Sequence, residues 1–324
     1  MMDKKWASIV LSAGRGTRMK SDLPKVMHQL LGKPLIGHVL DIIGTLNTEI
    51  NIVVTGHGSS IVEKYLDSHG KVVKVRQEEQ LGTGHAVRCA DSELRSFSGD
   101  VLILCGDTPL LTSESLLHFM HEHEASGADL SVLTAEFQDA AGYGRIVRGG
   151  PSWLELREIV EEKDASDEVK GIREVNTGIY AGDSKIILKC LEEIGCDNAQ
   201  GEYYLTDTVR IAREKGYRVH AFKGVTEQEA HGINSRRDLA AAEKILLERI
   251  RRKWMDEGVT FIMPELTYIE TGVRISRDAV IGPHVVLKGK TTIGQRAGIG
   301  AFSYLENAEI RDEVMLPPFS RIER

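Results

Sequence analysis

Residues 11–25 read L-S-A-G-R-G-T-R-M-K-S-D-L-P-K and directly follow the apolar run A-S-I-V at residues 7–10. The pattern joins a buried strand to a glycine-rich turn that carries two cations, Arg18 and Lys25. Small residues let backbone N–H groups approach an anion closely, and nearby cations neutralise its charge. The stretch therefore predicts a phosphate-handling loop at the end of a strand.

The loop matches neither of the two best-known phosphate motifs. It lacks G-x-x-x-x-G-K-[ST], and it fails G-x-G-x-x-G because Met19 stands where the third glycine should be. Gly14 and Gly16 alone would also suit an ordinary strand-to-helix turn. The added cations favour the phosphate interpretation.

Composition limits the function classes that suit this chain. Its 324 residues are enough for a large core and two domains. The net charge of −7 argues against nucleic acid as a partner, because no broad basic field is available to neutralise phosphates along a duplex.

Targeting signals are not evident. No stretch approaches the ~20 apolar residues that cross a bilayer, and the first apolar run is too short for a signal peptide. The cysteines form no C-x-x-C pair, which is typical of reduced thiols. We therefore expect a cytoplasmic protein with no membrane partner.

The first two-thirds of the chain alternate short β-branched runs with amphipathic stretches. This pattern predicts an α/β fold, a doubly wound, mostly parallel, Rossmann-like sheet with ligands beyond the carboxyl ends of its strands. The opening loop lies at such an end, and so does C-G-D at residues 105–107. The expected strands are residues 8–11, 50–55, 72–75, 101–104, 130–135 and 174–181, and the expected helices are residues 35–46, 59–68, 84–94 and 113–126.

After Gly258 aliphatic residues recur every sixth position, with one five-residue step. A period of six fits neither a helix nor a simple strand, but it predicts a short left-handed parallel β-helix of hexapeptide repeats. We therefore expect an α/β domain at residues 1–234, a linker helix at 235–257 and the β-helix at 258–324. The periodic positions are Ile269, Ile275, Ile281, Leu287, Ile293, Ile299, Leu305, Ile310, Leu316 and Ile322.

Several motifs recur in a fixed order along the chain. Together they resemble the bacterial UDP-N-acetylglucosamine pyrophosphorylases, also called N-acetylglucosamine-1-phosphate uridylyltransferases, over nearly the whole chain. The opening loop alone marks sugar nucleotidyltransferases broadly, and the later motifs narrow the resemblance to the N-acetylglucosamine branch. These later motifs are Q-E-E-Q-L-G-T-G-H-A at 77–86, C-G-D at 105–107, Y-G-R-I at 143–146, N-T-G at 176–178 and N-A-Q-G-E-Y-Y-L-T-D at 198–207.

The resemblance implies transfer of UMP from UTP to N-acetylglucosamine-1-phosphate, with release of pyrophosphate. The attacking phosphate is already an anion, so the protein must mainly hold two polyanions together and neutralise them. Arg18 and Lys25 suit that catalytic task. The resemblance also implies Mg²⁺ held by Asp107 and Asn234, and two oxygen ligands plus phosphates and waters are what this ion tolerates.

The resemblance assigns the remaining site residues to two sets. Gln77 and the backbone of Gly82 and Thr83 would read uracil, and an amide that both donates and accepts matches its mixed edge. Glu161 is assigned to the sugar through the pattern I-V-E-x-K, although its neighbour Glu162 could take its place. The nucleotide set is Leu11, Ser12, Ala13, Gly14, Gln77, Gln80, Gly82 and Thr83, and the sugar set is Gly144, Glu161, Asn176, Tyr204 and Thr206.

The family is usually fused to an acetyltransferase carried by a longer β-helix. Because this sequence stops at Arg324, we expect no acetyltransferase activity from it. We expect a homotrimer through the β-helix, as in the family. The alternatives are nucleotidyl transfer to another hexose-1-phosphate, or a non-catalytic paralogue that binds sugar nucleotides.

Overall fold

The computed structural model describes residues 4–149 and 155–324. The chain divides into two compact units, each with a hydrophobic core of its own. The first unit comprises the described residues up to His28 together with Leu35–Asn234, and the second comprises Gln29–Pro34 and Ser235–Arg324.

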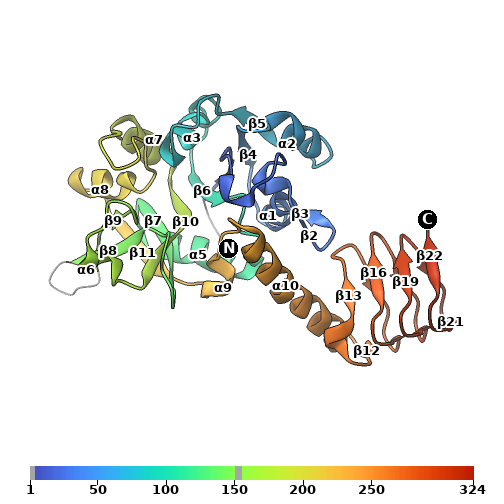
Figure 1. Cartoon of the computed structure of the whole chain (residues 1–324). Helices are drawn as coiled ribbons and strands as arrows, with labels where there is room; N and C mark the ends of the chain where they lie inside the picture. The colour runs from blue at the N-terminus through green and yellow to red at the C-terminus, as the bar shows by residue number, and fades with distance from the viewer. Residues whose placement is uncertain (1–3, 150–154) are drawn as a thin grey trace. The chain divides into compact units, whose positions relative to one another are not determined.

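The first unit is built on a mixed, mostly parallel sheet, drawn in Figure 1. The strand order β11-β7-β10-β6-β1-β4-β5 places β1 between β6 and β4, parallel to both. Strand β10 runs antiparallel to β6 and β7, and it also pairs with the β8–β9 hairpin. The strands are β1 Trp6–Ser12, β4 Ile50–Thr55, β5 Val73–Arg76, β6 Asp100–Cys105, β7 Leu130–Glu136, β8 Arg145–Gly149, β9 Glu155–Val160, β10 Glu174–Asp183 and β11 Val219–Lys223.

Helices cover both faces of this sheet, because its central strands are apolar on both sides. Ala7 and Ile9 of β1 pack in one core with residues of α3, α7 and α8. Trp6 and Val10 pack in the other with residues of α1, α2 and α5. The helices are α1 Leu35–Ile43, α2 Ser59–Leu66, α3 Thr83–Arg88, α4 Asp91–Leu94, α5 Ser113–Ser126, α6 Asp167–Lys170, α7 Ser184–Glu192, α8 Asp207–Glu214 and α9 Glu227–Ala230, with 3₁₀ turns η1 Thr17–Met19 and η2 Lys25–Met27.

The expected doubly wound α/β sheet is confirmed, and each expected strand is found within two residues of its predicted ends. The single helix expected at residues 84–94 is wrong. Two shorter helices, α3 and α4, replace it. The Ala90 N–H bonds to the carbonyl of Val87, three residues back, so the turn tightens there and the helix stops.

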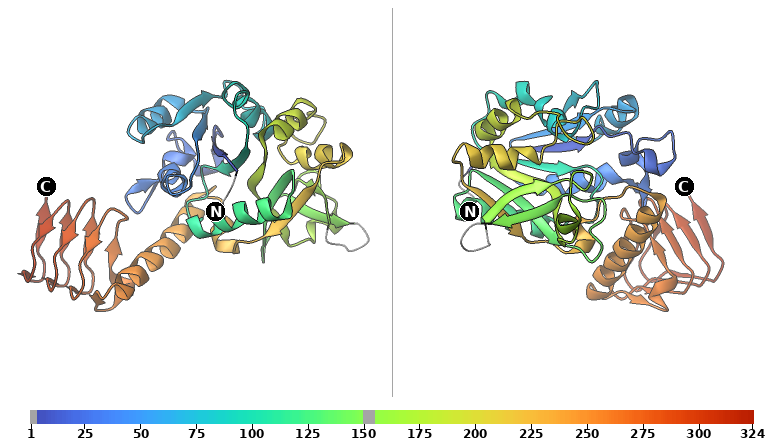
Figure 2. Two further views of the ribbon diagram at one scale, coloured as in Figure 1. Left: turned by 180° about the vertical axis from the view of Figure 1, so that it is seen from behind. Right: turned by 60° about the vertical axis from the view of Figure 1, so that its left-hand side comes forward.

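The second unit begins with helix α10, Arg236–Asp256. Its first turn is a capping box in which Ser235 and Asp238 each accept from the other's backbone N–H. Short strands in three parallel ladders follow. Figure 2 shows the stacked coils that these strands form. The strands are β12 Thr260–Phe261, β13 Tyr268–Ile269, β14 Arg274–Ile275, β15 Val280–Ile281, β16 Val286–Lys288, β17 Thr292–Ile293, β18 Gly298–Ile299, β19 Tyr304–Glu306, β20 Glu309–Ile310, β21 Met315–Leu316 and β22 Arg321–Glu323, with the 3₁₀ turn η3 Pro264–Leu266 and the small hairpin β2 Gln29–Leu30 and β3 Lys33–Pro34.

The aliphatic residues that recur every sixth position in the sequence are the residues that pair between neighbouring strands of the ladders. Ile269 stacks on Leu287, and Leu287 on Leu305, along one ladder of the β-helix. Ile293 pairs with Ile310 across the five-residue step, so the shorter repeat is absorbed without losing the inward phase. The periodic residues all belong to the core of this unit, with Leu316 and Ile322 partly buried at its last coil.

The four cysteines carry free thiols. Among the described residues, every helix is either too short or too polar to cross a bilayer.

Candidate active site

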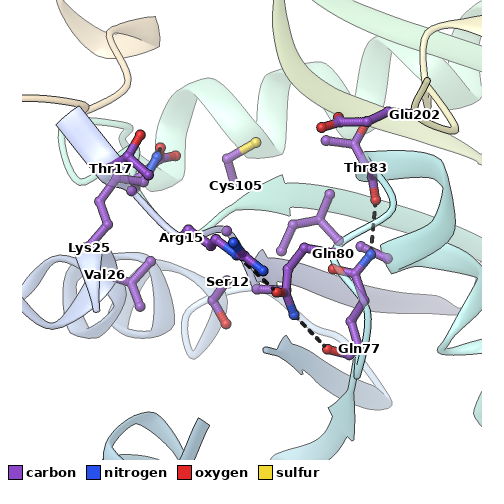
Figure 3. A pocket seen from close by; sticks show the side chains of 17 residues that line it. Ser12, Arg15, Thr17, Lys25, Val26, Gln77, Gln80, Thr83, Cys105 and Glu202 are labelled. Carbon is purple, nitrogen blue, oxygen red and sulfur yellow. Dashed lines mark hydrogen bonds and ion pairs between the residues drawn. The ribbon is translucent and has the colours of Figure 1, made fainter. Parts of the chain in front are cut away.

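A cavity of about 670 Å³ opens at the carboxyl ends of the parallel strands in the first unit. Residues that follow β1, β5 and β6 meet there, because parallel strands end at the same edge of a sheet. Figure 3 shows Lys25 and Thr17 on one side of the cavity, with Gln77 and Thr83 on the other. The lining residues are Leu11, Ser12, Ala13, Gly14, Arg15, Gly16, Thr17, Lys25, Val26, Gln77, Gln80, Gly82, Thr83, Ala86, Cys105, Asp107 and Glu202.

The glycine-rich loop folds tightly enough to bring Lys25 against it. Strand β1 ends at Ser12, whose hydroxyl donates to the carbonyl of Val54 at 2.8 Å. Gly16 has a φ of +60°, and a Cβ there would lie 2.6 Å from the Cβ of Lys25. Glycine is therefore required at this position both for backbone conformation and for the close approach of Lys25.

Lys25, Asp107 and Asn234 converge at one edge of the cavity. The Lys25 ammonium contacts the carboxylate of Asp107 and lies 3.0 Å from Oδ1 of Asn234. The Lys25 and Asp107 side chains are each 16% exposed, so this ion pair is largely shielded from water. The backbone N–H of Ile233 donates to the Asp107 carbonyl at 2.9 Å, which fixes the segment that presents Asn234.

The same residues suit a hard divalent cation. One carboxylate oxygen and one amide oxygen already face a single cationic atom, the Lys25 nitrogen. Carboxylate and amide oxygens are ligands that Mg²⁺ prefers, and this ion usually takes its remaining ligands from phosphates and water. The donor set therefore fits the ion that the resemblance implies.

Gln77 and Gly82 lie on the opposite side of the cavity. Gln77 is only 3% exposed, and its Nε2 donates to the Gly82 carbonyl at 3.0 Å. Gln80 folds back through its Nε2 onto the Gln77 carbonyl at 3.1 Å. Gly82 has a φ of +109°, and a Cβ there would lie 2.6 Å from the carbonyl oxygen of Tyr203. The Q-L-G-T-G turn thus needs glycine to pack against Tyr203.

The residues of the predicted sugar set form a second cluster. A Cβ at Gly144 would lie 3.5 Å from Oε2 of Glu161 and 3.6 Å from the Cβ of Asn176. The Asn176 N–H donates to the Gly144 carbonyl at 2.8 Å, and the Thr206 hydroxyl donates to Oε1 of Glu161 at 3.1 Å. Tyr204, buried on the same segment as Thr206, accepts from Nε2 of Gln200 at 2.8 Å.

One segment joins this cluster to the cavity. Glu202 lines the cavity, and the Tyr203 carbonyl accepts from the Gly84 N–H at 2.8 Å. Thr206, three residues later, reaches Glu161. The motif at residues 198–207 therefore links the turn beside Gln77 to the second cluster.

The two neighbouring glutamates have different surroundings. Burial raises the pKa of Glu161, and the hydrogen bond from Thr206 opposes that shift only in part. Glu162 instead pairs with the buried guanidinium of Arg145, 2.7 Å from its Nη2. Glu161 is thus the carboxylate beside Gly144 and Asn176, and Glu162 is committed to an ion pair.

Arg18 is not among the residues that line the cavity, although it directly follows the lining residue Thr17. It belongs to η1 and is exposed. Arg15 lines the cavity instead, and its Nε lies 3.5 Å from Oε1 of Gln80. Arg15 is not one of the predicted site residues, although its place between Gly14 and Gly16 in the loop is a signal for it. Thr17, Val26, Ala86 and Glu202 line the cavity as well and had no separate sequence signal.

Cys105 lies at the carboxyl end of β6 and lines the cavity. Its Sγ is 3.8 Å from the carbonyl of Gly178, and a Cβ at Gly178 would come within 2.9 Å of that sulfur. Burial raises the pKa of the thiol to about 12, so Cys105 is neutral and acts as a packing group rather than a nucleophile.

Comparisons with known proteins agree with this architecture. Residues 8–257 match the MobA-like NTP transferase domain. A solved structure described as UDP-glucose pyrophosphorylase complexed with UDP-glucose shares the fold, with a TM-score of 0.61 and 20% identity over 76% of this chain and 99% of that chain. The fold and the cavity thus define a nucleotidyltransferase.

Similar proteins identify the family within the nucleotidyltransferases. The bifunctional protein GlmU of Halalkalibacterium halodurans is 44% identical, over 97% of this chain and 72% of that protein. The GlmU proteins of an Exiguobacterium species and of Syntrophotalea carbinolica are each 46% identical, over 95% and 98% of this chain and 68% of those proteins. The chain belongs to the GlmU family of sugar-1-phosphate nucleotidyltransferases.

Proposed function

We propose that the chain transfers UMP from UTP to N-acetylglucosamine-1-phosphate and releases pyrophosphate in a Mg²⁺-dependent reaction. The observation that carries the proposal is the convergence of Lys25, Asp107 and Asn234 at the edge of a cavity whose far side presents Gln77. A cationic, oxygen-rich end suits a triphosphate, and a buried amide at the other end suits a base.

The chemistry needs no covalent intermediate. An oxygen of the sugar phosphate attacks the α-phosphorus in line, a new P–O bond forms, and the bond to the bridging oxygen breaks. Pyrophosphate leaves with that electron pair. The attacking oxygen carries no proton, so no general base is required, and positioning and charge neutralisation supply the catalysis.

Each residue of the site has a separate role in binding or charge neutralisation. Lys25 neutralises charge that develops on the phosphates, and Arg18 adds a second cation from the same loop. Asp107 and Asn234 would hold Mg²⁺, which when bound supplies Lewis-acid stabilisation of the phosphates. Gln77 and the 82–83 backbone orient the base. Glu161, with Thr206 beside it, accepts hydrogen bonds from the sugar.

The second unit, in this proposal, assembles the chain into homotrimers. Large apolar side chains are exposed on its successive coils: Val280 at 39%, Phe302 at 52%, Met315 at 72% and Phe319 at 76%. The rings of His284, Phe302 and Phe319 stack in sequence, with centroids 4.7 and 5.2 Å apart. Exposed apolar surface of this kind favours contact with another copy. A monomer by light scattering at micromolar concentration would contradict this assembly.

Pyrophosphate release tests the proposed reaction. The purified chain is assayed with UTP, CTP, ATP and GTP against N-acetylglucosamine-1-phosphate, glucose-1-phosphate and glucosamine-1-phosphate, with and without Mg²⁺. Metal-dependent release with UTP and N-acetylglucosamine-1-phosphate is expected to exceed every other pair. A preference for another sugar would support a different hexose-1-phosphate, and no release with any pair would support a binding paralogue. The expected absence of acetyltransferase activity from this sequence stays a prediction.

A further inference from the structure

The amide of Gln77 is oriented by two acceptors. Its Nε2 donates to the Gly82 carbonyl at 3.0 Å and lies 2.9 Å from Nδ1 of His85. An amide nitrogen can only donate, so Nδ1 of His85 must be the acceptor, and the ring proton of a neutral imidazole is then on Nε2. Both N–H bonds of Gln77 are therefore committed to the protein.

The amide oxygen of Gln77 is available to a ligand in the cavity. Figure 3 shows the nitrogen of Gln77 turned toward the 82–83 turn and the oxygen on the inner side of the pocket. Within the described residues no side-chain or backbone group donates a hydrogen bond to this oxygen. Because Gln77 is 3% exposed and both its amide hydrogens are held, the side chain offers the base a fixed acceptor.

A fixed acceptor discriminates between pyrimidines. Uracil carries a proton on N3 between two carbonyl groups, and that N–H can donate to the Gln77 oxygen. Cytosine has a lone pair on N3, which would face the same oxygen with no hydrogen between them. A site built to pair with one group rejects an analogue that lacks it, because its own buried group is left unpaired.

We propose that His85 is a positioning residue that determines base selectivity, by holding the Gln77 amide in the orientation that accepts from a pyrimidine N3–H. The proposal rests on the proposed function, since it assigns the cavity side near Gln77 to the base. His85 lies in α3, within the first turn after Gly82, so the turn that brings Gly82 to Gln77 also carries the imidazole. Without the imidazole acceptor only the Gly82 carbonyl holds the amide, so turning its N–H₂ toward N3 of cytosine costs less.

Binding of UDP and CDP to the full chain tests this role by calorimetry, independently of turnover. The wild type is expected to prefer UDP. His85→Leu is expected to lower the UDP-over-CDP ratio by about tenfold, the value of one net hydrogen bond. His85→Asn places an amide oxygen near the position of Nδ1 and is expected to retain the ratio. The matched control is His121→Leu in α5, where the replaced side chain is 69% exposed; its ratio should equal that of the wild type.

The outcomes separate this inference from the proposed reaction. A wild-type ratio that persists in His85→Leu overturns the role of His85. If His85→Leu does not fold by circular dichroism, His85→Ala, which also lacks the acceptor, takes its place; a lowered ratio there supports the proposal and a retained ratio overturns it. A wild type that prefers UDP but releases no pyrophosphate contradicts the proposed reaction alone. A wild type that binds UDP and CDP equally overturns this inference.

Discussion

The Lys25 ammonium lies 3.0 Å from Oδ1 of Asn234, although 209 positions separate the two residues in the sequence. The same nitrogen contacts the carboxylate of Asp107. Three segments of the first unit therefore meet at the Lys25 ammonium. They are the turn after the glycine-rich loop, the end of β6, and the segment that follows α9. A cation already stabilises the two oxygens that are proposed to bind Mg²⁺.

Lys25→Ala should remove most turnover while leaving the fold intact. The lysine is expected to neutralise charge on the phosphates as the α-phosphorus is attacked, and losing such a group lowers kcat by about 10²–10³-fold. Steady-state pyrophosphate release measures the loss, and the circular dichroism spectrum checks the fold. Lys64→Ala, at an exposed position of α2, is the matched control. Turnover within twofold of wild type in Lys25→Ala would remove this residue from the mechanism.

Asp107→Asn should weaken divalent cation binding. The change keeps the size of the side chain and an oxygen but removes the charge that suits a hard cation. Mn²⁺ binding, followed by electron paramagnetic resonance without nucleotide, is expected to weaken roughly 10–100-fold, the range seen when groups around a metal are altered. Asp197→Asn, at an exposed position, should bind Mn²⁺ like the wild type. Equal Mn²⁺ affinity in all three proteins would rule out Asp107 as a ligand.

The roles of Glu161 and Glu162 can be distinguished by replacing each residue in turn with glutamine. Glu161→Gln is expected to raise KM for the sugar phosphate about tenfold, because a charged acceptor for the sugar is lost. Glu162→Gln should leave that KM near the wild-type value and lower the free energy of unfolding by about 1–3 kcal/mol, because the buried Arg145 loses the carboxylate it pairs with. Steady-state kinetics and urea unfolding measure the two effects. The reverse pattern would assign the sugar contact to Glu162.

A buried carboxylate at the start of β6, Asp100, should make stability depend on pH. Asp100 lies 2.8 Å from the Lys4 ammonium and 3.4 Å from Nε2 of the buried His123. Burial alone would raise the pKa of Asp100, but the bonds from His123 and Lys4 outweigh it, and the net shift is downward. A lowered pKa means that the carboxylate stabilises the fold above the ordinary carboxyl range, and that this contribution is lost as pH falls through the lowered pKa.

Asp100→Asn should therefore lose about 1–3 kcal/mol of unfolding free energy at neutral pH, because a buried charged hydrogen-bond acceptor is removed. The difference between wild type and variant should shrink on acidification, as measured by urea unfolding at several pH values. A difference that is constant with pH would show that Asp100 acts through packing rather than charge.

Much of the fold could be predicted from local patterns in the sequence. The apolar run before the glycine-rich loop became β1, and the hexad of aliphatic residues became the register of the β-helix, including the shorter step between Leu305 and Ile310. Both patterns are local, and each dictates its structure through burial of one set of side chains. The break between α3 and α4 was not predictable, because Ala90 is a good helix former. The chain turns there to bury Ala90 and Leu94 in the core.

The candidate site was predictable in its residue types but not in its geometry. Motifs pointed to Lys25 and Asp107, and the resemblance added Asn234, whereas the meeting of the three residues at one atom depends on the crossover topology of the sheet. The cavity-facing position of Arg15 and the exposed position of Arg18 depend on where the chain turns after Gly16, which has a positive φ. The role of His85 follows only from its distance to Gln77.

Uridylyl transfer by this chain is measured as pyrophosphate release from UTP and N-acetylglucosamine-1-phosphate, compared in one assay with the other triphosphates and sugar phosphates. We expect Mg²⁺-dependent release that is highest for this pair and is lost in Lys25→Ala. Higher release with another nucleotide or sugar, or no release from the folded wild type with any pair, would contradict it.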